Sequence, residues 1–131
     1  WSSDVCSSDL ILASKMGAKK MLAIDIDEWA VENSKENCAR NGVGNVEVIR
    51  GDAGSLPGKE FDIILANINR NVLLADMEIY ARALSSGGEI FLSGFYEQDI
   101  EAIQTSAEKN HLKLTGKNIL NQWAMLRFSK P

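Results

Sequence analysis

Three apolar segments of the chain each end in a polar side chain whose chemistry suits a nucleoside. The segments are Met21–Asp25, Val46–Asp52 and Phe61–Asn67, and the polar residue is the last of each. If the segments are parallel strands, their ends meet at the carboxyl edge of one sheet, where open α/β folds bind ligands. Carboxylates accept hydrogen bonds from hydroxyl and amino groups, and a carboxamide both donates and accepts them. The sequence therefore predicts a nucleoside-binding site.

These polar residues also have a structural interpretation, which the sequence leaves open. A carboxylate after a buried strand, such as that of Asp25, is costly unless it is satisfied, and it could cap a neighbouring loop or helix. Asp52 could begin a turn over Gly51–Ser55. The loop that follows Asn67 could contact a substrate through Asn69, Arg70 and Asn71, or it could be a solvated loop that carries a helix cap.

The predicted elements alternate between strand and helix. Nearly continuous apolar strands over Met21–Asp25 and Phe61–Ala66 are typical of parallel strands buried on both faces, and Val46–Arg50 is a further strand. Helices are predicted over Leu10–Met16, from a cap at Asp27 to Arg40, from a cap at Asn71 along the apolar positions Leu73, Met77, Tyr80, Ala81 and Leu84, and around Ile100, Ile103 and Ala107. Glycines at Gly17, Asn41-Gly42 and Gly87-Gly88 are placed to end the first three helices.

The last third of the chain departs from simple alternation. After a fourth strand over Glu89–Ser93, the segments Leu112–Ile119 and Gln122–Phe128 are separated only by Leu120-Asn121. That link is too short for a crossover helix, so the two segments must pair as an antiparallel hairpin. We therefore predict an α/β fold with a mostly parallel, Rossmann-like sheet and an antiparallel hairpin at its C-terminal end.

Composition narrows the function classes. The chain has 131 residues, 45% hydrophobic and 24% charged, with a formal net charge of −4, which is typical of one globular domain and argues against a binder of nucleic-acid backbone. Two cysteines and one histidine are too few for a disulfide framework or a metal-ligand cluster. No apolar run is long enough to span a membrane and no signal peptide is visible, so we expect a cytoplasmic protein without a metal.

Residues 1–10 differ from the rest of the chain. They are rich in Ser and Asp, have neither strand nor helix periodicity, and resemble translated sequencing-adapter sequence joined to a reading frame. The alternative is a disordered tail. We therefore expect an artefactual or disordered leader over 1–10 and a single domain over 11–131.

Several short motifs, taken in order, carry a family resemblance. They are Gly17-Ala18-Lys19-Lys20, Ile24-Asp25-Ile26-Asp27, Ala30-Val31, Glu36-Asn37, Asn41-Gly42-Val43, Gly51-Asp52, Ala66-Asn67-Ile68, Gly87-Gly88, Ser93-Gly94 and Trp123-Ala124. The alternating fold with a reversed last strand resembles class I S-adenosylmethionine-dependent methyltransferases. Within that class the motifs resemble the family of ribosomal protein L-eleven methyltransferases, over essentially all of 11–131.

The resemblance implies S-adenosylmethionine as cofactor and particular roles for the residues at the sheet edge. Asp25 would bind the ribose hydroxyls and Ile26 would contact the adenine ring. Asp52 would accept the exocyclic amine of adenine, and the backbone N–H of Ala53 would donate to the ring. Asn67 would carry the chemistry, because methyl transfer is an in-line displacement that requires a neutral amine held at attack distance, and a carboxamide oxygen with a nearby backbone carbonyl can orient that amine.

The same resemblance implies a protein N-methyltransferase that acts, as a monomer, on lysine and terminal amines of a large-subunit ribosomal protein, L-eleven. The family also has a first strand and a glycine-rich loop upstream of Gly17, and the strand would lie between the Met21 and Phe61 strands. Both are missing here, so we expect a truncated domain that folds poorly, binds S-adenosylmethionine weakly and is inactive by itself.

Other functions remain open on the sequence. A small-molecule or other class I methyltransferase shares every predicted cofactor residue. A dinucleotide-binding oxidoreductase also has an acid after its second strand, although neither the terminal hairpin nor Asn67 is needed for hydride transfer. A non-catalytic interaction domain is the third alternative.

Overall fold

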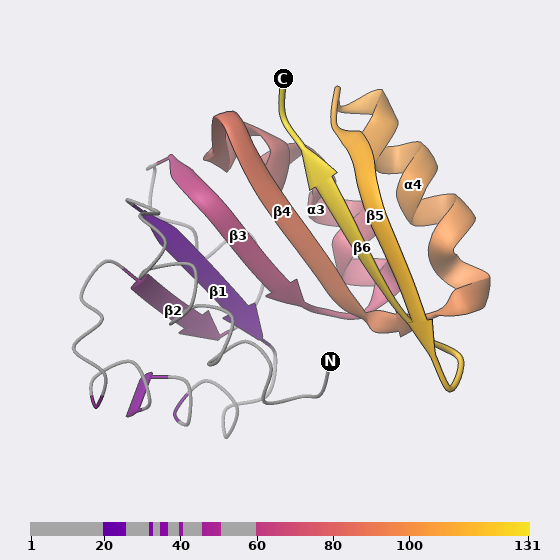
Figure 1. Ribbon diagram of the computed structural model, residues 1–131, viewed down its shortest axis with the longest axis horizontal. Coiled ribbons are helices and arrows are strands. Elements are labelled where there is room, and N and C mark those ends of the chain that lie inside the picture. Colours follow the sequence, from indigo (N-terminus) through magenta and orange to yellow (C-terminus); the bar gives the residue numbers. More distant parts are fainter. Residues whose placement is uncertain (1–19, 26–31, 33–34, 37–39, 41–45, 51–59) are drawn as a thin grey trace.

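The computed structural model describes residues 20–25, 32, 35–36, 40, 46–50 and 60–131, and Figure 1 shows that they are organised around one six-stranded sheet. The strands are β1 (Met21–Asp25), β2 (Val46–Arg50), β3 (Phe61–Asn67), β4 (Leu84–Tyr96), β5 (Lys113–Leu120) and β6 (Trp123–Ser129). The helices whose bounds the structure describes are α3 (Arg70–Ala83), the 3-10 turn η2 (Glu97–Asp99) and α4 (Ile100–Lys109). Their spatial order is β2-β1-β3-β4-β6-β5.

The first four strands form the parallel part of the sheet. β1 pairs with β2 and β3, and β3 pairs with β4, all in parallel register. All five residues of β1 are buried, which explains its continuous apolar sequence. β6 runs antiparallel between β4 and β5, so the predicted mostly parallel sheet with a terminal antiparallel hairpin is confirmed.

In the family that the motifs resemble, a further strand would lie between the Met21 and Phe61 strands, and we expected this chain to lack it. In the described part of the chain, β1 and β3 are hydrogen-bonded neighbours from Met21↔Ile63 to Asp25↔Asn67. The physical reason is that an open strand edge leaves backbone N–H and C=O groups without partners, and direct pairing of these two buried strands satisfies them.

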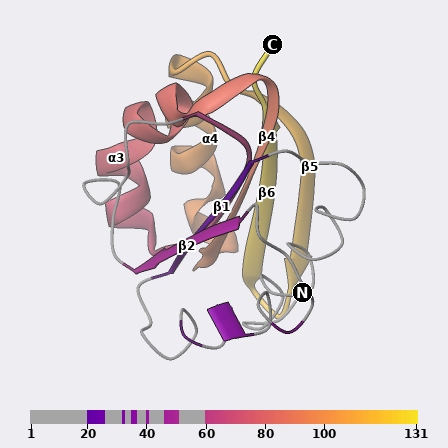
Figure 2. The ribbon, with the colours of Figure 1, turned by 90° about the vertical axis from the view of Figure 1, so that its left-hand side faces the viewer.

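Helices α3 and α4 lie side by side on one face of the sheet (Figure 2). Alternate strand residues point toward them and form the core, among them Ile64 and Ala66 of β3, Ile90 and Leu92 of β4, and Ala124, Leu126 and Phe128 of β6. From the helices, Leu73, Met77 and Tyr80 of α3 and Ile103 and Ala107 of α4 are buried against that face. The intervening strand residues therefore face the opposite side of the sheet.

The start of α3 corrects one predicted cap. Asn69, rather than Asn71, is the N-cap: its backbone is extended (φ −66°, ψ 161°) and its Oδ1 accepts a hydrogen bond from the backbone N–H of Val72 at 3.1 Å. Asn71 lies inside the helix because Arg70 already has helical geometry. Asparagine is a favoured N-cap residue at either position, but only Asn69 has the extended backbone of a cap.

The end of α3 corrects a second prediction. The helix ends at Ala83, and Gly87 and Gly88 lie within β4, which begins at Leu84. The Gly87 N–H donates to the Lys130 carbonyl at 2.7 Å, and the Lys130 N–H donates to the Gly88 carbonyl at 3.0 Å. These bonds to the C-terminal end of the chain hold the two glycines in the sheet rather than at the end of the helix. Leu84, predicted on the helix face, is buried as the first residue of β4.

The C-terminal hairpin turns one residue later than predicted. Its two-residue turn is Asn121-Gln122, with φ of 51° and 73°, and not Leu120-Asn121. Positive φ at both positions matches the mirror-image turn that suits the twist of antiparallel strands. The predicted fourth strand, Glu89–Ser93, is the central part of the longer β4, and the predicted helix around Ile100 is α4.

Several predictions fall largely outside the described residues. They are the helix over Leu10–Met16, most of the helix from Asp27 to Arg40, and the end signals at Gly17 and Asn41-Gly42. Within the second helix, residues 32, 35–36 and 40 are helical, and Arg40 forms an ion pair with Glu36 at 2.6 Å. None of the helices in the described part of the chain is long and apolar enough to cross a membrane.

Candidate functional site

A row of polar side chains crosses the carboxyl ends of β1, β3 and β4. Asp25, Asn67 and Ser93 are register partners on these adjacent strands, so they lie on the same face of the sheet, away from α3 and α4. Asp25 and Ser93 are each only 8% exposed, and Asn67 is partly buried. We call these three residues the polar row.

Hydrogen bonds within the polar row determine which way the Asn67 amide points. Its Nδ2 donates to Oδ2 of Asp25 at 2.9 Å, and its Oδ1 accepts a long bond of 3.4 Å from the Ser93 hydroxyl. Because an ionised carboxylate can only accept, the amide nitrogen must face Asp25. The amide oxygen is therefore directed toward the end of β4.

Gly94 allows that oxygen to approach the backbone of β4 closely. It has φ of +93°, and a Cβ atom added there would lie 2.7 Å from Oδ1 of Asn67, 2.9 Å from the Ile68 backbone nitrogen and 3.1 Å from the Ile68 carbonyl oxygen. Asn67 Oδ1 and the Ile68 carbonyl oxygen therefore both lie close against Gly94, and any side chain at residue 94 would collide with them. We call Asn67 Oδ1 and the Ile68 carbonyl oxygen the acceptor pair.

Further bonds join the two loops that carry the acceptor pair and Gly94. The Ile68 N–H donates to the Ser93 carbonyl at 3.0 Å. One carboxylate oxygen of Asp99 lies 3.3 Å from the Arg70 guanidinium, and the other accepts the Tyr96 N–H at 3.2 Å. Asp99 is buried, where a carboxylate needs partners, and its two bonds link the start of α3 to the end of β4.

The structure brings together two of the five predicted site residues. Asp25 and Asn67 were expected at the same edge of the sheet, and they are hydrogen-bonded there. Ile26, Asp52 and Ala53 lie outside the described residues. Neither Ser93 nor Gly94 was assigned a role of its own from the sequence, although both belong to the Ser93-Gly94 motif. Only the register between β3 and β4 shows how this motif lies relative to Asn67.

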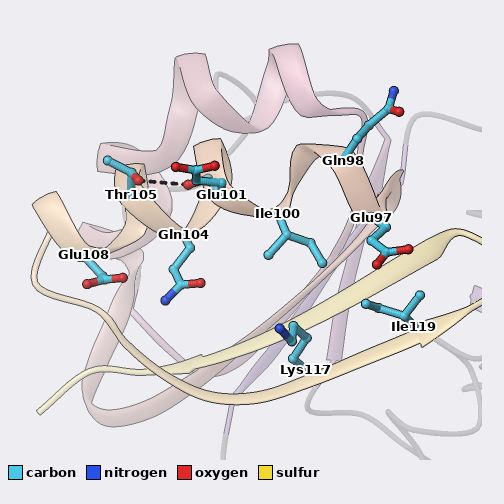
Figure 3. A pocket seen from close by; sticks show the side chains of 9 residues that line it. All are labelled: Glu97, Gln98, Ile100, Glu101, Gln104, Thr105, Glu108, Lys117 and Ile119. Carbon is cyan, nitrogen blue, oxygen red and sulfur yellow. Dashed lines mark hydrogen bonds between the residues drawn. The ribbon is translucent and has the colours of Figure 1, made fainter.

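A separate cleft of about 560 Å³ lies between α4 and β5 (Figure 3). Its lining includes Glu101 and Glu108 from α4 and Lys117 and Ile119 from β5. The Thr105 hydroxyl bonds to the backbone carbonyl of Glu101 there at 2.8 Å. None of the polar row or the acceptor pair lines this open cleft. Among the described residues, no group of three His, Cys, Asp or Glu side chains is placed to hold a metal ion.

A mostly parallel sheet with a reversed β6, and polar side chains at its carboxyl edge, defines the Rossmann-like fold of class I methyltransferases. A solved structure of ribosomal protein L11 methylase from Lactobacillus delbrueckii subsp. bulgaricus superposes with a TM-score of 0.74 and 26% identity, over 98% of this chain and 65% of that one. The family model described as ribosomal protein L11 methyltransferase (PrmA) matches residues 7–131. The chain belongs to this family.

Curated relatives support the same placement. A ribosomal protein L11 methyltransferase of Bacteroides fragilis is 50% identical over 119 residues, which are 90% of this chain and 42% of that protein. One of Porphyromonas gingivalis is 47% identical over 120 residues, 91% of this chain and 41% of that protein. The chain therefore spans less than half the length of the curated relatives that it matches.

Proposed function

We propose that this chain forms part of a protein N-methyltransferase that transfers a methyl group from S-adenosylmethionine to lysine and terminal amines of ribosomal protein L11. The observation that carries the proposal is the acceptor pair: Asn67 Oδ1 and the Ile68 carbonyl oxygen lie near each other beside Gly94, at the carboxyl edge of the sheet. The family and the names of its relatives supply the acceptor protein. A ribosomal substrate also implies a cytoplasmic reaction, and we propose that the enzyme acts as a monomer.

The acceptor pair can orient an amine for attack. A neutral primary amine has two N–H hydrogens and one lone pair, so two oxygens that accept both hydrogens leave the lone pair pointing away from them. Asp25 contributes indirectly, because its bond to Nδ2 holds the Asn67 oxygen toward Gly94. Holding a reactant in this way contributes by proximity and orientation, and it requires no strong general base.

The chemistry of the polar row also fits the cofactor. S-adenosylmethionine, when bound, supplies an electrophilic methyl group. Asp25 would accept hydrogen bonds from the ribose hydroxyls, since a carboxylate has about four lone-pair positions. By family resemblance, Ile26, Asp52 and Ala53 would hold the adenine, and Asn67 would lie between the cofactor and the acceptor amine.

The test is methyl transfer by the complete gene product that contains this chain. We expect Asn67→Ala to lower kcat for transfer to ribosomal protein L11 by about 10²- to 10³-fold, the usual effect of removing one positioned polar group. Transfer is measured as incorporation of labelled methyl from S-adenosylmethionine. Asn118→Ala, which removes an exposed asparagine of β5, is the matched control and should keep its kcat.

Two outcomes would contradict the proposal. Unchanged kcat in Asn67→Ala would show that the chemistry lies elsewhere or that the domain only binds partners. Efficient methylation of small amines with no methylation of ribosomal protein L11 would favour a small-molecule methyltransferase. Calorimetric binding of S-adenosylmethionine to the Asn67→Ala variant separates lost transfer from lost cofactor.

A further inference from the structure

Three exposed apolar side chains form a second row across the other half of the sheet. Tyr96 of β4 pairs with Trp123 of β6, and Trp123 pairs with Leu120 of β5. Their exposed fractions are 45%, 51% and 58%, and the Tyr96 and Trp123 rings stack with centroids 4.4 Å apart. We call these residues the apolar row. Large apolar side chains that are contiguous and exposed mark interaction sites more often than scattered ones do.

The apolar row lies on the same face of the sheet as the polar row. Ala124 and Leu126 of β6 belong to the core beneath α3 and α4, so Trp123 points to the opposite face. In β3, Ala66 belongs to the same core, so Asn67 also points to the opposite face. Both rows lie toward the carboxyl end of β4, which contains Ser93 as well as Tyr96.

The spacing of the rows fits a polypeptide rather than a single side chain. Ser93 and Tyr96 are three residues apart, so the rows are separated by about 10 Å along β4. A lysine whose amine is held by the acceptor pair has only a four-carbon stem. That stem is too short to reach the far side of the apolar row, so the residues that flank the lysine would lie over it.

Charge around the two rows favours a basic segment. Asp25 is the charged member of the polar row, and Glu97, which follows Tyr96 in the sequence, lies just after the end of β4 and lines the cleft between α4 and β5. The nearest arginine on β6, Arg127, is already engaged by Glu89 at 2.7 Å and by the Phe91 ring at 5.5 Å. Aromatic ring faces attract cations, and tryptophan does so most strongly.

We propose that the apolar row is the docking surface for the basic polypeptide segment that flanks the methylated lysine of the acceptor protein. In this arrangement a Lys or Arg of that segment stacks on Tyr96 and Trp123, while the target amine reaches the acceptor pair. The inference rests on the proposed function, because it assigns a recognition surface to the same amine-methylation site.

The test compares two acceptors in the complete gene product: intact ribosomal protein L11, and a lysine capped at both ends, which is too short to reach the apolar row. Trp123→Ala should raise KM for the protein acceptor about tenfold, within the range of a cation–aromatic contact. It should leave kcat, the binding of S-adenosylmethionine and KM for the capped lysine within about twofold of wild type, because these do not involve the row.

Matched variants separate recognition from folding. Ile79→Ala truncates another exposed apolar residue, 42% exposed on α3, and should leave both KM values unchanged. Trp123→Phe keeps a ring face and should restore most of the lost affinity. If Trp123→Ala fails to fold, Leu120→Ser tests the same row with the stacked ring pair intact.

Three results would overturn the inference. One is a protein KM for Trp123→Ala equal to that of Ile79→Ala. Another is an equal rise in KM for the capped lysine, which would place the ring at the target amine itself. The third is a change in oligomeric state in sedimentation, which would make the row a contact between copies of the chain. A wild-type enzyme that methylates neither acceptor refutes the proposed function instead, and the inference with it.

Discussion

Strand β4 contains two glycines with positive φ, a backbone region that other residues rarely adopt. The space around the two glycines differs. Gly94 has φ of +93° and Gly87 has φ of +82°. A Cβ atom at Gly94 would collide with Asn67 and Ile68, whereas a Cβ atom at Gly87 would meet nothing within 4 Å. Both positions need glycine for its positive φ, but only residue 94 also needs glycine because there is no room for a side chain.

The comparison extends to the two ends of the sheet. At the Gly94 end, Asn67 donates to Asp25 and accepts from Ser93, and Asp99 accepts from the Tyr96 N–H at the end of β4. At the Gly87 end, backbone bonds join β4 to Lys130, and none of the polar row or the acceptor pair takes part in them. Changes at the first end should therefore alter catalysis, and changes at the second should alter only stability.

The sharpest test of this comparison is an alanine at each glycine. Gly94→Ala should lower kcat about 10- to 100-fold, because the methyl group must displace the acceptor pair and small misplacements of that kind are costly. Gly87→Ala should keep kcat and lose only about 1–2 kcal/mol of stability from the strained backbone. Methyl-transfer kinetics and urea denaturation of both variants measure the two effects. Equal kcat values would show that the space beside Gly94 is not used.

Lys130 should affect stability without affecting catalysis. Its ammonium donates to the Ala81 carbonyl at 3.0 Å and to the Leu84 carbonyl at 2.8 Å, where α3 ends. Lys130→Met should lower the free energy of unfolding by about 1–2 kcal/mol, since it leaves these carbonyls without the charged donor. Lys113→Met, at an exposed position of β5, is the control for charge loss. A drop in kcat without destabilisation would refute the assignment of this end to packing.

The smallest effect is expected at the cap of α3. Asn69→Ala should cost about 1 kcal/mol of unfolding free energy by removing the bond from Val72 N–H to Asn69 Oδ1. Asn71→Ala should cost less, because an exposed helix position favours alanine. Urea denaturation of the two variants distinguishes them, and a greater loss in Asn71→Ala would place the cap at Asn71.

Prediction from the sequence succeeded where the residues of one segment by themselves indicate its secondary structure. The bounds of β1 follow from a short apolar run, because a parallel strand buried on both faces needs apolar side chains throughout. The bounds of the edge strand β2, Val46–Arg50, also match the prediction. It failed at Gly87-Gly88, whose role depends on bonds to Lys130, more than forty residues away. It also failed at the hairpin turn, where Asn121-Gln122 lacks the glycine that would mark positive φ.

The site was predicted in part for the same reason. Asp25 and Asn67 stood out because polar residues at the ends of apolar runs are conspicuous, and their direct hydrogen bond agrees with the expected meeting. The roles of Ile26, Asp52 and Ala53 stay predictions. Gly94 belongs to a short motif and Tyr96 to none, and neither was given a role, since their importance comes from what lies across the neighbouring strands.

The amino-acid sequence by itself determined which residues end the strands, which faces are apolar and that the last two strands form a hairpin. These are properties of side-chain type and of period along one segment. Only the tertiary structure decided that β1 lies directly beside β3, that the Asn67 oxygen points toward Gly94, and that Tyr96, Trp123 and Leu120 align. Register and strand neighbours depend on hydrogen bonds between distant segments, and no single segment specifies them.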